Sequence, residues 1–193
     1  MKKTLQLIAL SLSLSTYAQK ETYASFALKT DVRNAVLGSK PTNNNPALDI
    51  TASVNMVSNN FEISFGDEYF QRIGFNSTFV NFGYHFPRYI SLGAKEIDIT
   101  VIPYAGFSLI TRFGKEDKEI ITPEQDFYVY GKSAHISAQA GLSFRVKLSD
   151  KFLLDWTCEA MARPDLSYLY PTDPNKAVVV SNYVGVHYIF SNF

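Results

Sequence analysis

Apolar and polar side chains alternate along most of the chain. From Leu48 to Met56 every even position is apolar and every odd position polar, and the alternation restarts at Phe61 after Ser58-Asn59-Asn60. A period of two predicts β-strands with two different faces, and two such runs joined by a short polar segment predict a hairpin. No helical periodicity follows residue 18, so we predict an all-β fold. The eight predicted strands are residues 22–32, 47–57, 60–70, 74–86, 96–112, 133–148, 151–163 and 178–190.

The lengths of the strands and of their connections favour a membrane barrel. Most of the predicted strands reach the ~9–11 residues that cross a bilayer when tilted, whereas ordinary strands have ~5–6. Short turns at one end, long loops at the other and an even strand count are typical of an up-and-down transmembrane barrel. Residues 87–95 and the short connection 71–73 fit this rule less well than the rest. The expected outer connections are 33–46, 71–73, 113–132 and 164–177, and the expected inner turns are 58–59, 87–95 and 149–150.

The first 18 residues have the order of a secretory signal peptide. Lys2 and Lys3 are followed by the apolar stretch Leu5–Leu14, and small residues, Thr16 and Ala18, precede an expected cut after Ala18. The apolar stretch is too short to span a bilayer as an anchor. We therefore expect residues 1–18 to be removed on export and residues 19–193 to form one barrel domain. The mature chain would carry a net charge of −2, because cleavage removes two lysines and no acid.

Composition narrows the class of protein. Lysine plus arginine balance aspartate plus glutamate at 18 each, so the chain lacks the basic field that attracts nucleic acid. The 15 phenylalanines and 12 tyrosines suit strands and the aromatic girdles of membrane barrels. A soluble periplasmic carrier of an apolar ligand, built like a lipocalin, has the same alternation with its apolar face turned inward.

The polar face carries charges of both signs in the middle of the strands. Such a mixture suits the interior of an eight-stranded barrel, which is only wide enough to be filled by side chains. We therefore predict a polar lumen network rather than an open channel. Its predicted members are Lys29, Asp49, Glu62, Asp98, Arg145, Lys147, Asp155, Glu159 and Arg163.

The end of the chain resembles the insertion signal of outer-membrane β-barrel proteins. Tyr183, Gly185, Tyr188 and Phe190 occupy the positions of its polar residue, its glycine and its alternating aromatics, although Ser191-Asn192-Phe193 follow. With the signal peptide, this pattern makes the chain similar to the eight-stranded OmpA/OmpX-like barrels, in particular those of Bacteroidota. The resemblance implies residence in the outer membrane, contact with its lipid and recognition by the barrel assembly machinery. It implies a non-enzymatic role in envelope structure, or in binding and adhesion through the loops.

Candidate chemistry is sparse. His85, His135 and His187 show no metal-ligand spacing, and we predict no metal site and no cofactor. His135 and Ser137 lie two residues apart on one strand face and resemble the His-x-Ser pair of an outer-membrane lipid A acyl hydrolase, with Ala138 where that family has Asn. The alternative interpretation is two polar lumen residues. Arg163 and Asp165 form a candidate loop ion pair worth under ~1 kcal/mol if exposed.

Overall fold

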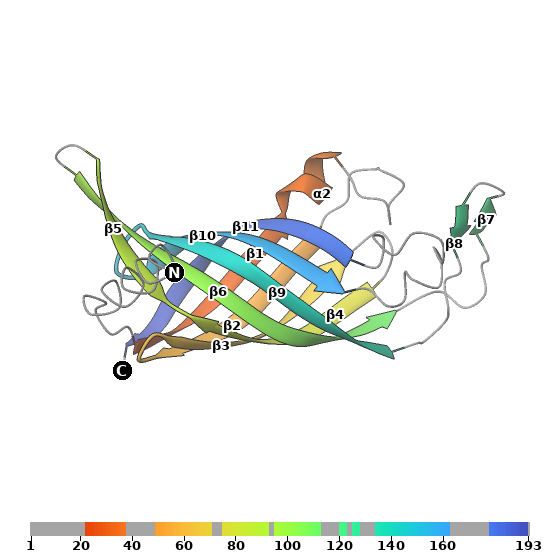
Figure 1. Ribbon diagram of the computed structural model, residues 1–193, viewed down its shortest axis with the longest axis horizontal. Coiled ribbons are helices and arrows are strands. Elements are labelled where there is room, and N and C mark those ends of the chain that lie inside the picture. The colour runs from red at the N-terminus through yellow and green to blue at the C-terminus, as the bar shows by residue number, and fades with distance from the viewer. Residues whose placement is uncertain are drawn as a thin grey trace, which may run out of the picture.

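The structure, a computed structural model, describes residues 22–37, 49–70, 75–92, 95–112, 120–122, 125–127, 134–162 and 178–192. Eight antiparallel strands form a closed barrel, because β4 pairs with β6 and β1 pairs with β11 (Figure 1). The ring consists of β1 (Thr22–Asp31), β2 (Asp49–Ser58), β3 (Phe61–Phe70), β4 (Phe75–Tyr84), β6 (Lys95–Arg112), β9 (Ala134–Lys147), β10 (Phe152–Ala162) and β11 (Val178–Asn192). The predicted eight-stranded all-β barrel is confirmed.

The two ends of the barrel differ. We call the end where β1 begins and β11 ends the base, and the opposite end the rim. The base holds the turn at Asn59-Asn60 and the turn between β9 and β10. At Asn59 and Asn60 the backbone has positive φ, 51° and 69°, and asparagine tolerates such angles in two-residue hairpin turns.

A two-stranded ribbon extends the barrel at the base and corrects the predicted turn at residues 87–95. Strand β5 (Phe86–Leu92) pairs with the first part of β6, from Leu92↔Lys95 to Phe86↔Val101 (Figure 1). The predicted strand 74–86 therefore divides near His85, whose backbone N–H donates to the carbonyl of Asn60 at 2.8 Å. Pro87 lies within β5, where the edge of a sheet tolerates proline.

Two small elements at the rim were also not predicted. Helix α2 (Val32–Leu37) follows β1, and β7 (Ile120–Thr122) pairs with β8 (Gln125–Phe127) within the predicted loop 113–132 (Figure 1). A helix of six residues is under two turns, which is too short to produce a visible apolar period. Within the described segments, no helix is long and apolar enough to cross a membrane.

Polar and apolar side chains point to opposite sides of the barrel wall. In β10 the side chains of Asp155, Thr157 and Glu159 are buried in the lumen, whereas Phe152 and Trp156 are exposed on the outside. The same alternation runs through the other strands of the ring, as a strand's pleat requires. At the base, the lumen is floored by four buried apolar residues, Tyr23, Val57, Leu153 and Ile189. The barrel is therefore polar inside, above an apolar floor.

Candidate functional site in the barrel lumen

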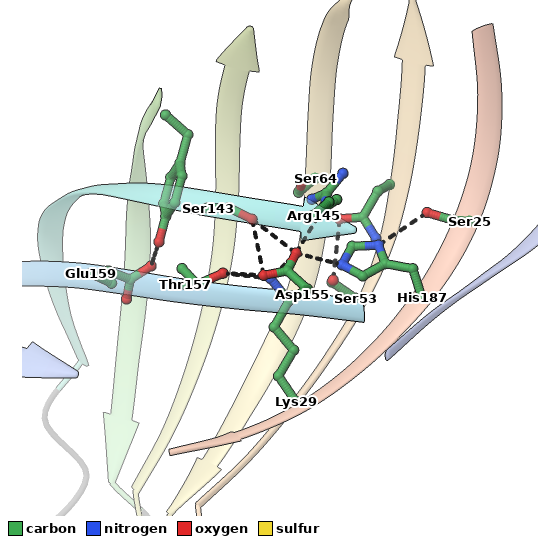
Figure 2. Close-up of polar contacts among 12 residues, drawn as sticks. Ser25, Lys29, Ser53, Ser64, Ser143, Arg145, Asp155, Thr157, Glu159 and His187 are labelled. Carbon is green, nitrogen blue, oxygen red and sulfur yellow. Dashed lines mark hydrogen bonds and ion pairs between the residues drawn. The ribbon is translucent and has the colours of Figure 1, made fainter. Parts of the chain in front are cut away.

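Asp155 is the centre of a buried polar network directly above the apolar floor (Figure 2). Its Oδ2 accepts from Arg145 Nε at 2.8 Å and from Lys29 Nζ at 3.1 Å, and it lies 2.8 Å from His187 Nε2. The hydroxyls of Ser143 and Thr157 also donate to Asp155, at 2.9 and 2.5 Å. These contacts come from β1, β9, β10 and β11, so the network joins four strands of the ring.

Arg145 connects this centre to a second carboxylate across the lumen. Its guanidinium makes a two-pronged contact with Glu62, through Nη1–Oε2 and through Nη2–Oε1 at 2.8 Å. Glu62 Oε2 also lies 2.7 Å from His85 Nε2, and Oε1 accepts from the hydroxyl of Ser64 at 2.7 Å. Two carboxylates thus face two cations, Arg145 and Lys29. A buried pair needs such matched charge and hydrogen bonding to offset its desolvation.

A layer of tyrosine–glutamate pairs lies closer to the rim. Tyr104 donates its hydroxyl to Glu159 Oε2 at 2.7 Å, and Tyr183 donates to Glu68 Oε1 at 2.7 Å. The second contact spans the lumen, from β11 to β3. Between this layer and the charged network lies a cavity of about 40 Å³. A single buried water needs roughly 10–15 Å³ of such space, so the cavity admits a few waters or one small ion.

Glycines in the wall allow these side chains to reach one another. Gly185 of β11 is the register partner of both Lys29 and Asp155, so the lysine stem crosses directly over it. A Cβ added to Gly185 would lie 2.6 Å from Lys29 Cγ, closer than packed atoms approach. Gly141 of β9 stands in the same relation between Tyr104 and Glu159, and its Cβ would overlap the tyrosine ring. Each glycine thus opens a path between a donor and its acid.

The structure brings together five of the nine predicted lumen residues, Lys29, Glu62, Arg145, Asp155 and Glu159, around the same space. Asp49 is buried near the rim. Arg163 and Asp165 fall outside the described residues.

Two predicted lumen residues lie elsewhere. Lys147 is half-exposed at the end of β9 and pairs with exposed Asp150 at 3.0 Å, because β9 reaches the solvent at the base there. Asp98 belongs to the ribbon, where it faces Tyr89 of β5, and pairing of β6 with β9 begins only at Ile99. Placing these two residues in the lumen was therefore wrong. Both errors come from strands that continue past the ring, a property that alternation does not reveal.

Ser137 is buried on the lumen side, as its position in the alternation predicts. Its hydroxyl donates to the backbone carbonyl of Ala162 on the neighbouring strand. The side chain of His135 lies outside what the structure describes. Nothing in the described geometry supplies a base to Ser137, and its hydrogen is already committed to a carbonyl.

The residues of the expected insertion signal divide between the two faces of β11. Tyr183 and Gly185 face the lumen, where they take part in the contacts above, while Tyr188 and Phe190 are exposed on the outside.

Sequence reasoning missed several members of the lumen layers, namely Glu68, Tyr104, His85 and Ser143. Glu68, Tyr104 and Ser143 have the inward position in their strands, and His85 continues the inward alternation of β4 one residue past its end, so the alternation could have identified all four. Among the described residues, no group of three or more His, Cys, Asp or Glu side chains could hold a metal ion together.

Comparisons with known proteins bear on the fold. No protein-family model matches the sequence, and no curated protein matches it. The N-terminal β-barrel domain of Pseudomonas aeruginosa OprF is similar in structure, with a TM-score of 0.52 and 11% identity over 89% of this chain and 100% of that one. A de novo designed transmembrane β-barrel (TM-score 0.46, 11% identity, 89% and 98% covered) and Neisserial surface protein A (0.45, 12%, 88% and 96%) were also found. At this identity the OprF match shows a shared barrel fold.

Proposed function

We propose that this chain is an integral outer-membrane protein whose barrel wall faces lipid. The observation that carries the proposal is the apolar character of the outer face of that wall. Large apolar side chains remain exposed on the outside of strands around the ring, far more than a soluble surface displays as one continuous belt. They include Phe26, Leu28, Val54, Met56, Phe65, Phe82, Phe107, Leu109, Ile136, Leu154, Trp156, Val184 and Val186.

Aromatic contacts near the base support a membrane boundary there. Phe61, Tyr84 and Phe86 pack edge-to-face in a row, with ring centroids 4.9 and 4.8 Å apart. Phe152 and Tyr188 form another outward pair with centroids 5.4 Å apart. Membrane barrels place such residues in girdles at the lipid–water interface.

The interior argues against a soluble carrier. A lipocalin-like carrier needs an apolar interior with room for its ligand, whereas this lumen is crossed by the ion pairs of Arg145 with Glu62 and Asp155. The cavity of about 40 Å³ is too small for an apolar ligand. The polarity of the two faces is the reverse of what a carrier requires.

Within the membrane, we propose a non-enzymatic role. The filled lumen makes the barrel a rigid support that contributes to envelope structure and carries its rim connections for binding or adhesion. Its expected partners are outer-membrane lipid and, during insertion, the barrel assembly machinery. The hydrolase alternative is tested by replacing Ser137 with Ala and measuring acyl chains released from lipid A. We expect no release by the parent chain, and release that depends on Ser137 would overturn the non-enzymatic proposal.

The single tryptophan provides the decisive test of the membrane proposal. Trp156 is the only tryptophan in the chain and is 48% exposed on the outer face of β10. After reconstitution into vesicles that contain brominated phospholipid, we expect strong quenching of its fluorescence. The matched control carries Trp156→Phe and Phe79→Trp, which moves the indole to a buried lumen position. Equal quenching of the native chain and of this double variant would contradict the proposal, as would recovery of the native chain in the soluble periplasmic fraction.

A further inference from the structure

One charged side chain lies on the otherwise uncharged outer face of the ring. Among the described residues, and leaving the ribbon aside, Asp67 of β3 is the only charged residue at an outward position. It is exposed between two aromatic residues of the same face, Phe65, 56% exposed, and Tyr69, 49% exposed. A charge on the lipid face of a membrane barrel costs free energy, and ionisable groups kept in such places mark functional positions.

The carboxylate of Asp67 is held in place by two side chains of the neighbouring strand. Its Oδ1 accepts from Thr78 Oγ1 at 2.5 Å and from Asn76 Nδ2 at 3.3 Å, both on β4. In the described part of the chain, Oδ2 accepts no hydrogen bond. The register partner on β2 is Ala52, whose methyl group is too short to cover the carboxylate. One carboxylate oxygen is thus fixed in position and open toward whatever surrounds the wall.

Asp67 lies at a depth that lipid headgroups reach. Strand β3 ends at Phe70, three residues closer to the rim. With the usual rise and tilt of a barrel strand, the carboxylate is roughly 7 Å below the end of β3. The boundary between headgroups and acyl chains has a similar depth, about 5–10 Å. Tyr69, the next outward residue toward the rim, is of the type that lies at membrane–water interfaces.

We propose that Asp67 binds the primary ammonium group of a membrane lipid headgroup, such as that of phosphatidylethanolamine. The inference rests on the proposed function, because only a wall that faces lipid presents this carboxylate to a headgroup. Charge complementarity selects a cation, and the open Oδ2 selects a cation with N–H donors, which form charge-assisted hydrogen bonds to carboxylates. The Tyr69 ring adds a cation–π surface, and Phe65 offers an apolar surface to the acyl chain. A basic side chain of another protein has matching charge, but lipid surrounds the wall without a second chain being needed.

Lipid-selective quenching of fluorescence tests the proposal. The Phe65→Trp/Trp156→Phe variant places the single indole next to Asp67 on the outer face, whereas the parent has its indole on β10, four strands away in the ring of eight. Each barrel is reconstituted in equal mixtures of phosphatidylethanolamine and phosphatidylcholine, with one lipid or the other brominated. Phosphatidylcholine is the matched probe, because its quaternary ammonium has the same charge without N–H donors. At position 65 we expect phosphatidylethanolamine to have a roughly two- to fivefold higher relative affinity, as an exposed ion pair provides. Both lipids should quench Trp156 equally.

Substitutions at position 67 provide the controls. In the variant with the indole at position 65, Asp67→Asn should abolish the preference and Asp67→Glu should retain it, and heat-modifiable migration checks that each variant has folded. Equal affinity of the two lipids at position 65, a preference that survives Asp67→Asn, or an equal preference at Trp156 would each overturn the proposal; the first result would leave the carboxylate to a basic side chain of another protein. Quenching by neither lipid at either position would instead contradict the membrane location itself, so the two failures are distinguishable.

Discussion

Gly141 illustrates how one missing side chain determines a contact two strands away. The Tyr104 ring crosses β9 above it to reach Glu159. We predict that Gly141→Ala breaks this hydrogen bond and lowers the free energy of unfolding by about 1–3 kcal/mol, the usual cost of leaving a buried polar group unsatisfied. Urea unfolding of the reconstituted barrel measures the change. In a Tyr104→Phe background, which already lacks the hydrogen bond, the same substitution should cost less; an equal cost in both backgrounds would show that the clash with the ring carbons, and not the lost hydrogen bond, determines the loss.

Arg145 and Lys147 are two residues apart on β9 and form a matched pair of tests. Arg145 is buried between Glu62 and Asp155, whereas Lys147 meets Asp150 in solvent. Arg145→Met should destabilise the barrel by roughly 3–5 kcal/mol, because it leaves two buried carboxylates without their shared partner. Lys147→Met should change stability by less than about 1 kcal/mol. If urea unfolding showed similar losses of stability for the two variants, the placement of Arg145 in a buried charged network and of Lys147 in solvent would be contradicted.

The ribbon of β5 and β6 is an extension that the barrel does not need for closure. Pairing of β6 with β4 and β9 involves residues from Ile99 onward, and residues 95–98 pair only with β5. We predict that replacing residues 89–98 by Asn-Gly, a pair favoured in two-residue hairpin turns, leaves a folded barrel. Heat-modifiable migration measures folding. Deleting residues 102–105, which lie within the ring, is the control and should abolish it; failure of the shortened ribbon to fold would assign it a part in barrel formation.

The outer face of β11, near the base of the barrel, carries the aromatic residues of the expected insertion signal. Tyr188 and Phe190 are exposed on the outside of the barrel. If the barrel assembly machinery reads them, Phe190→Ala should slow insertion into membranes that contain the machinery while leaving spontaneous folding in detergent nearly unchanged. Phe65→Ala, which also removes an exposed outward phenylalanine, is the control. Equal slowing by both variants would mean that only lost apolar surface matters.

At the scale of the whole molecule, the filled lumen predicts a barrel that does not conduct ions. Above the floor the interior is crossed by Arg145–Glu62, Tyr183–Glu68 and Tyr104–Glu159, and the cavity among them measures about 40 Å³. Planar bilayer recordings should therefore show no steady conductance from the purified chain. A stable open level would show that the lumen side chains rearrange in the membrane.

The sequence predicts which side of the barrel wall a residue faces better than it predicts which residues meet inside the lumen. A barrel obeys the strand period throughout the ring, so alternation assigned Glu62, Asp155 and Glu159 to the inner face. The alternation could not identify their partners. Glu62 and Arg145, for example, are separated by 83 residues of sequence, and their contact depends on the register of all the intervening strands. The roles of Gly141 and Gly185 depend on the same register and carry no local signal.

The pairing of β1 with β11 also dictates an order of events. Ser25 and His187 lie 162 residues apart along the chain, yet their side chains are 3.3 Å apart across the closing seam. Until the last strand is available, β1 is an open edge, and open edges invite pairing with other chains. Contacts of such sequence separation also form slowly. The forming barrel therefore keeps an unpaired edge until β11 joins β1, and until then it depends on being held apart from neighbouring chains.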